Sequence, residues 1–207
     1  MAARRGARHG RDMPVTSFLS LLPDRAALAA ELAPPAPTVG RLRRELDRAE
    51  QRFVGRVVAA GGIAAWRAEA SADLAAARAA PPSGRSRSRS AGLVVALLDG
   101  VVRDRCWLAV ERGGPAGLPG WADLWRHLAC HALPPYRAEP LFLLAWTVWR
   151  SGDRVTAGLV NAMVAGEDPA HRAAGLLDQV LRLRLDPARV PPLSNPRPSR
   201  AGRGGGR

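Results

Sequence analysis

The chain has 207 residues, a formal net charge of +13 and an apolar fraction of 47%. This length fits one domain, or one domain with a small companion, and the apolar fraction is ordinary for a globular protein. Two cysteines are too few for a disulfide framework, and no apolar run reaches the length of a membrane span. Alanine is abundant while Phe and Tyr are scarce, which favours helices over strands. We therefore predict an all-α, cytoplasmic protein with no membrane partner.

The N-terminal part is predicted to hold an unstructured arm followed by helices. Residues 1–21 show no helical periodicity and should form a disordered basic arm. Residues 22–80 should form a helical hairpin region, with Thr38 as the N-cap of its second helix. The pair Gly61–Gly62 should break the helical pattern, and the next helix should end near Ala79.

Three further segments follow in chain order. Residues 81–91, which read PPSGRSRSRSA, are predicted to be a linker; an interaction role for the Arg–Ser repeats is the alternative. Residues 92–187 should form a helical bundle, interrupted by a Gly/Pro loop from Gly113 to Gly120. Residues 188–207 are rich in Arg, Gly and Pro, and they should form a disordered tail.

One pair of helices in the bundle has the spacing of a tetratricopeptide-like unit. Small residues at two facing positions would let antiparallel helices approach closely, and a proline would close the unit. The positions are Ala145, Gly152, Ala157, Asn161, Val164 and Pro169. A single such unit predicts a helical hairpin, whereas a peptide-binding groove needs several stacked repeats.

Most of the positive charge falls outside the predicted helices. The stretch from 90 to 186 carries equal numbers of Arg and acidic residues, while both ends and the Arg–Ser segment are basic. Every basic residue apart from His is Arg, which also fits the codon usage of a GC-rich genome. The leading hypothesis is a non-catalytic helical scaffold or protein-interaction module. The alternative is a nucleic-acid-associated protein that binds through its basic arms.

Candidate reactive residues are few. His127 and His131 lie four residues apart, a spacing that can hold zinc on one helix face, but no third ligand is indicated nearby. Cys130 would need an oriented base to act as a nucleophile, and none is apparent. We therefore predict no catalytic residue, no cofactor and no metal site.

The tryptophans are the candidate contacts with a protein partner, and packing in the core is their alternative role. The four concerned are Trp121, Trp125, Trp146 and Trp149.

Several phrases of the sequence occur in an order that is typical of one family. They are Leu22–Pro34, Val102–Asp104 with Trp107, Leu124–Arg126, Pro140–Trp146, Gly152–Asp153 and Asp168–Pro169. Together they resemble the actinobacterial family called domain of unknown function 4192, over Leu22 to Pro187. The resemblance implies no established activity. Members of the family usually begin with a strand-rich half, so this chain resembles the helical C-terminal half. We expect a truncated or split gene product, or a start codon placed too late, with the missing half as a possible partner.

Overall fold

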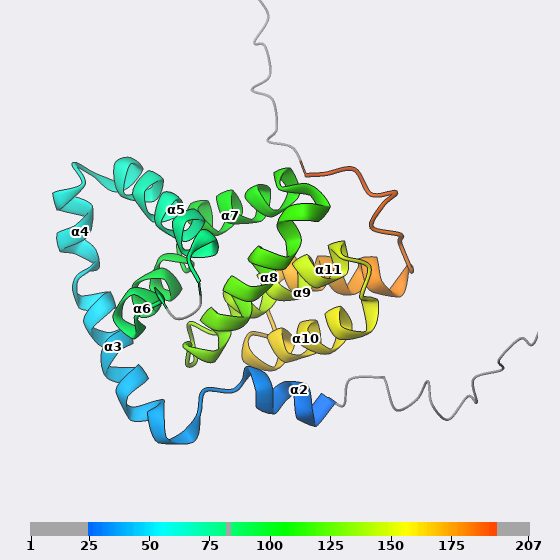
Figure 1. The fold of residues 1–207 in the computed structure, drawn as a ribbon, viewed down its shortest axis with the longest axis horizontal. Coiled ribbons are helices and arrows are strands. Elements are labelled where there is room, and N and C mark those ends of the chain that lie inside the picture. Colours follow the sequence, from blue (N-terminus) through cyan, green and yellow to red (C-terminus); the bar gives the residue numbers. More distant parts are fainter. Residues whose placement is uncertain (1–24, 82–83, 194–207) are drawn as a thin grey trace, which may run out of the picture.

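The computed structural model describes residues 25–81 and 84–193, and within these ranges it is all helical, with no strand (Figure 1). The predicted fold class is therefore confirmed, while the predicted arm over residues 1–21 lies outside the described ranges. No described helix is long and apolar enough to cross a membrane. The helices in chain order are α2 (Arg25–Leu32), the short 3₁₀ helix η1 (Ala36–Thr38), α3 (Val39–Gln51), α4 (Phe53–Ala59), α5 (Ile63–Ala79), α6 (Arg87–Ala96), α7 (Gly100–Arg112), α8 (Gly114–Cys130), α9 (Ala138–Arg150), α10 (Arg154–Glu167) and α11 (Arg172–Arg182).

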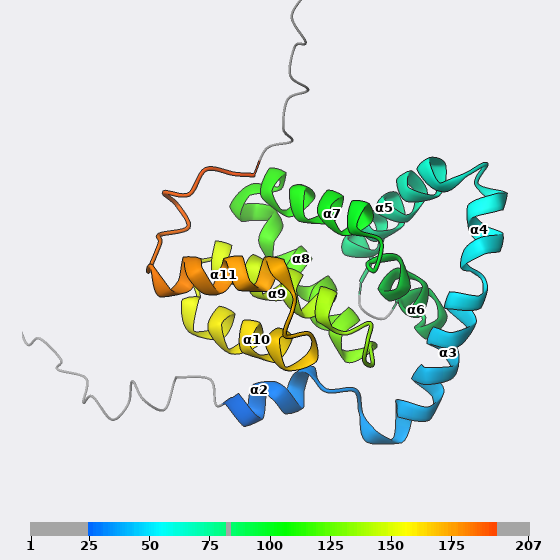
Figure 2. The ribbon, with the colours of Figure 1, turned by 180° about the vertical axis from the view of Figure 1, so that it is seen from behind.

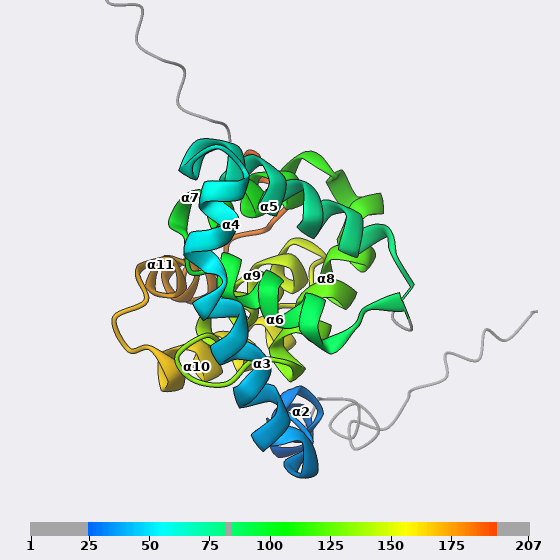
Figure 3. The ribbon, with the colours of Figure 1, turned by 90° about the vertical axis from the view of Figure 1, so that its left-hand side faces the viewer.

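Helices α3 and α4 follow each other along one side of the molecule, and α5 then turns back (Figure 3). The reversal occurs at Gly61 and Gly62, whose φ angles are 85° and 129°. Side chains rarely tolerate such angles, so glycine is required at this turn. The predicted break at this pair is confirmed. Helix α3 packs mainly against α6, which joins the N-terminal helices to the rest of the core.

The predicted linker needs a correction at its C-terminal end, because Arg87 begins helix α6. The Ser86 side chain caps this helix by accepting a hydrogen bond from the N–H of Arg89. The guanidinium of Arg85 donates to the carbonyls of Ala77 and Ala80 at 3.0 Å each. A capping serine and an apolar face buried against α3 therefore outweigh the polar composition. The central arginines thus belong to the folded body.

The predicted loop from Gly113 to Gly120 also needs a correction, because α8 begins at Gly114. A Cβ on Gly117 or on Gly120 would lie 3.6 Å from the side chain of Arg78 on α5. This is an ordinary contact distance, so α8 packs on α5 through the Arg78 side chain, whose guanidinium lies 5.1 Å from the centre of the Trp121 ring. Tertiary packing overrides the weak helix propensity of glycine and proline here.

Helix α9 lies at the centre of the bundle and packs on α8 and α10 (Figure 2). It forms a hairpin with α10 through a tight turn at Gly152, whose φ is 94°. Ala145 and Ala157 are fully buried, which is consistent with a close approach of the two helices. The predicted helical hairpin is confirmed, and its tetratricopeptide-like character stays a prediction.

Gly158 and Gly152 provide a matched test of helix propensity, since an added Cβ would meet no atom within 4 Å at either site. Gly158 lies inside α10 with ordinary helical geometry, so we expect Gly158→Ala to raise the free energy of unfolding by about 0.5–1 kcal/mol. Gly152→Ala should lower it by about 1 kcal/mol because of its positive φ. Urea unfolding of the two variants measures both values, and a loss of stability in Gly158→Ala would contradict the expectation.

Candidate functional site

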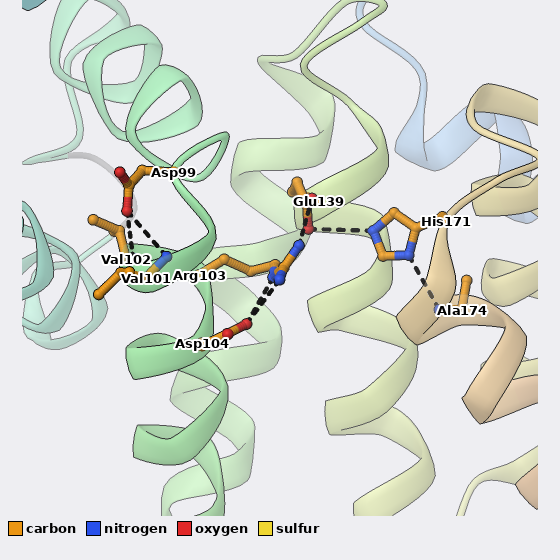
Figure 4. Close-up of polar contacts among 8 residues, drawn as sticks. All are labelled: Asp99, Val101, Val102, Arg103, Asp104, Glu139, His171 and Ala174. Carbon is orange, nitrogen blue, oxygen red and sulfur yellow. Dashed lines mark hydrogen bonds and ion pairs between the residues drawn. The ribbon is translucent and has the colours of Figure 1, made fainter. Parts of the chain in front are cut away.

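Polar side chains that include titratable groups gather between helices in several places, and three of these groups are candidates for a functional site. The first group joins α7, α9 and α11, and its centre is Glu139 (Figure 4). One carboxylate oxygen of Glu139 accepts a hydrogen bond from Arg103 at 3.1 Å, and the other lies 3.2 Å from Nε2 of His171. Asp104 binds the same arginine at 2.9 Å. The His171 side chain is only 4% exposed.

The Glu139–His171 pair resembles the carboxylate–histidine part of a catalytic triad. However, the second ring nitrogen of His171 already has a hydrogen-bond partner. Nδ1 of His171 accepts the backbone N–H of Ala174 at 3.1 Å and thereby caps α11. The proton of the neutral ring must then sit on Nε2 and point at Glu139. A histidine whose free lone pair holds a helix N–H cannot take a proton from a substrate without losing that cap. The arrangement fixes α11 against α9.

The second group contains Ser90 and His127, whose Oγ and Nε2 atoms lie 2.8 Å apart. Ser90 is 1% exposed, and its hydroxyl donates to the carbonyl of Ser86 at 3.0 Å. With the hydroxyl hydrogen on that carbonyl, the serine oxygen accepts a hydrogen bond from Nε2–H of His127, which is the reverse of what nucleophile activation requires.

The two histidines of the zinc-like spacing are stacked, with ring centres 4.2 Å apart. Nδ1 of His131 lies 2.8 Å from the carbonyl oxygen of His127, and Nε2 of His127 faces Ser90. These nitrogens do not converge on a common point. In the part of the chain that the structure describes, no group of three His, Cys, Asp or Glu residues gathers in a way that could hold a metal.

The position of His127 predicts a dependence of stability on pH. Burial, followed by the nearby charges of His131 and Arg85, lowers the pKa of His127 from 6.5 to about 4. Between these values the unfolded chain binds a proton that the folded chain does not, so stability falls as the pH falls. Because the His127 side chain is only partly buried, screening by solvent reduces the loss to about 1–2 kcal/mol. Urea unfolding at pH 7, 5.5 and 4 should show that the free energy of unfolding falls less steeply in His127→Gln than in the wild type. The same fall in both proteins would contradict this prediction.

Neither cysteine has the environment of a nucleophile. Burial raises the pKa of Cys106 to about 12. Burial is also the main cause of a raised pKa for Cys130, whose thiol donates to the carbonyl of Glu31 at 3.3 Å. Both environments disfavour the reactive thiolate.

The third group lies where α7 and α9 end, and it joins these helices to the segment after α11. Glu111 and Arg150 form a buried ion pair in which their side chains are 1% and 10% exposed. The same carboxylate accepts the indole N–H of Trp146 at 2.6 Å. The Arg150 guanidinium lies over the rings of Trp146 and Trp149, 5.6 Å and 5.0 Å from their centres. We call Glu111 and Arg150 the clamp.

The disordered tail was predicted to begin at residue 188, and the contacts of the clamp show that this start is too early. Arg150 donates to main-chain carbonyls of Pro187, Val190 and Pro191, so residues 187–193 lie against the folded body. Residues 194–207 lie outside the described ranges. We call residues 187–193 the strap. Sequence reasoning missed the clamp because its two members are 39 residues apart and form no local motif.

The four candidate tryptophans all lie in the core. Trp125 and Trp149 are fully buried, and Trp121 and Trp146 are 3% and 2% exposed. Trp121 stacks on Trp125 with ring centres 5.1 Å apart. Contact of these side chains with a partner stays a prediction, and it would require that the core opens.

Comparison with family models found a match to the family described as domain of unknown function (DUF4192), over residues 13–188. Comparisons with curated proteins and with solved structures found no match. The family match spans most of the chain and contains every described helix, together with the three polar groups. This chain belongs to the family described as domain of unknown function (DUF4192).

Proposed function

We propose that this protein is a non-catalytic helical scaffold that binds another protein through its α4–α5 hairpin. One observation carries the proposal: helix α4 contributes no buried residue and exposes large apolar side chains. Val54 and Val58 are 68% and 72% exposed, and Ile63 at the start of α5 is 41% exposed. Val54 and Val58 are one helical turn apart, so they share a face.

The inner face of the same helix explains why it remains in place. Phe53 and Val57 are partly buried against the core, and the Phe53 ring meets the Trp66 ring edge-on at 4.8 Å. The inner face of the hairpin therefore packs on the core. Its outer apolar face is not covered by any other element among the described residues. Exposed apolar side chains that gather on one element are typical of interaction surfaces.

The chemistry of the polar groups supports the non-catalytic part of the proposal. His171 and His127 use their ring nitrogens in bonds that join helices, and both thiols have raised pKa values. The partner that we propose is another protein. The experiment that tests the proposal also distinguishes protein binding from nucleic-acid binding by the basic ends.

Site-specific photo-crosslinking in cells tests the proposal. A photoreactive phenylalanine analogue at position 58 should give a defined protein adduct, whereas the analogue at Gln179, on the exposed side of α11, should not. The adduct should disappear in Val54→Asp, and the free energy of unfolding of that variant should stay within about 0.5 kcal/mol of the wild type. Equal crosslinking at both positions, or adducts that nuclease removes, would overturn the proposal.

A further inference from the structure

The successive helices α3 and α4 carry a row of arginines, and both helices face the viewer in Figure 3. The row consists of Arg41, Arg44, Arg48, Arg52 and Arg56, and we call it the arginine stripe. Its members are three or four residues apart, the spacing that places side chains on one helix face. The spacing continues from α3 into α4, because the N–H of Arg52 donates to the carbonyl of Arg48 at 3.2 Å and that of Arg56 to the carbonyl of Arg52 at 2.9 Å. Successive members are therefore attached roughly 4.5–6 Å apart along the axis.

Most members of the arginine stripe have no counter-charge of their own. Arg41, Arg44 and Arg52 are exposed, and they form no ion pair with any described residue. Arg48 pairs with Glu45 on the same helix at 3.1 Å, and its side chain is 57% exposed. The donors of these guanidiniums are therefore available to an anionic partner in solvent.

The arginine stripe leads into a small cavity beside the start of α6. The cavity has a volume of about 100 Å³, and its polar lining comes from Arg52, Arg56, Asp73, Ser88 and Arg89. Asp73 is the only carboxylate among the described residues that line it. Its oxygens lie 3.4 Å from Arg56 and 3.9 Å from Arg89, longer than the roughly 2.7–2.9 Å of a good charge-assisted hydrogen bond. Three guanidiniums therefore surround one loosely paired carboxylate.

The Arg–Ser segment provides the α6 side of this cavity, because Ser88 and Arg89 lie in the first turn of the helix. The neighbouring serines are already used, since Ser86 caps α6 and Ser90 is buried against His127. Ser88 is exposed, and its hydroxyl forms no hydrogen bond with a described residue. It therefore offers a further donor to an anion that the guanidiniums hold.

The surface of α3 has the chemistry that binds a phosphate backbone. Every exposed residue of α3 is glycine, polar or charged. It therefore lacks the apolar or aromatic anchors on which protein interfaces and membrane-bound helices depend. Guanidiniums with unused donors match the oxygens of phosphate groups. No aromatic side chain is exposed among residues 39–59, so stacking of unpaired bases has no platform there and a double helix is the better fit.

We propose that the arginine stripe and the adjoining cavity bind the phosphate backbone of duplex DNA, whatever its base sequence. One phosphate enters the cavity and takes the place of Asp73 beside Arg56 and Arg89, and its neighbours along the strand contact the stripe. Contacts to phosphates position a protein on DNA and carry no sequence information. The proposal does not depend on the proposed function, because Val54 and Val58 are each two residues from Arg56 and do not share its face.

Fluorescence anisotropy of a labelled duplex of about 24 base pairs, titrated with the full chain, tests the proposal. The affinity of the wild type should fall steeply as the salt concentration rises from about 50 to 200 mM, and two unrelated sequences should bind equally. The combined change Arg41→Gln, Arg44→Gln and Arg52→Gln should weaken binding about tenfold and reduce the slope of log K against log salt by about 2–3. Absence of binding by the wild type at about 50 mM salt would overturn the proposal.

A second triple variant with the same loss of charge is the matched control. It replaces three exposed arginines of α7 and α11 that have no ion-pair partner among the described residues: Arg105→Gln, Arg112→Gln and Arg172→Gln. This variant should keep its affinity within about twofold of the wild type. Equal losses in the two triple variants would show that net charge or the basic ends bind DNA, and they would overturn the proposal. Tighter binding of a single strand than of the duplex would overturn it as well.

The cavity has a test of opposite sign. Asp73→Asn removes the carboxylate that competes with a phosphate for Arg56 and Arg89, so it should tighten binding of the duplex about two- to fivefold. Asp178→Asn makes the same change of charge on α11, where the side chain is 52% exposed compared with 45% for Asp73, and it should leave the affinity unchanged. Unchanged or weaker binding in Asp73→Asn would overturn the assignment of a phosphate to the cavity.

Discussion

Glu111→Ala lowers the free energy of unfolding by about 3–5 kcal/mol, the range for a buried ion pair that loses one partner. The substitution leaves the Arg150 guanidinium, in a side chain that is 10% exposed, without its counter-charge. It also removes the acceptor of the Trp146 indole and of the Leu193 N–H. The cost arises mainly from groups left buried and unpaired, because the intact pair itself gains little over an apolar replacement.

Urea unfolding of the full chain measures this loss, and an exposed ion pair provides the control. Asp123 and Arg126 are 61% and 42% exposed and pair at 3.5 Å, so Asp123→Ala should change the free energy of unfolding by less than about 0.5 kcal/mol. Similar losses of unfolding free energy in Glu111→Ala and Asp123→Ala would show that the ion pair of the clamp behaves like a solvent-exposed pair.

The helices that the sequence predicted well are those whose apolar spacing is regular and whose ends carry strong signals. Leu42 and Leu46 lie on the buried face of α3, as their four-residue spacing predicts. Helix α9 is buried on nearly every side, in agreement with its continuous apolar run. Gly61–Gly62 ends α4 because only glycine suits those backbone angles. In each case the cause is local to the segment.

The elements that were predicted wrongly depend on contacts from distant parts of the chain. Arg–Ser repeats become the start of α6 because Ser90 is buried where α6 meets α8. The glycine-containing start of α8 is helical where it packs against α5, and Gly117 and Gly120 lie beside the Arg78 side chain. The strap is ordered because of Arg150, 37 to 41 residues earlier. The two partners of each such contact are too far apart in the sequence for a local pattern to reveal them. The local composition of these segments therefore predicted linkers and loops.

Trp149→Ala should lower the free energy of unfolding by about 3–5 kcal/mol, as for other large-to-small changes in a core. Its side chain is fully buried, its ring lies 4.9 Å from that of Trp146, and the Arg150 guanidinium rests on it. If Trp149 served mainly as a partner contact, its truncation would weaken binding while the melting temperature stayed near that of the wild type. A loss of only a few tenths of a kcal/mol would therefore contradict its assignment to the core.

Phenylalanine at the same position separates the packing of the indole from its hydrogen bonding. Nε1 of Trp149 has no acceptor among the described residues, whereas Nε1 of Trp146 donates to Glu111 at 2.6 Å. Both changes remove similar volume from neighbouring turns of α9. Trp146→Phe should therefore cost about 1–3 kcal/mol more than Trp149→Phe, since it leaves a buried carboxylate one donor short. Equal costs in urea unfolding would mean that the hydrogen bond from Trp146 to Glu111 adds nothing to the stability of the clamp.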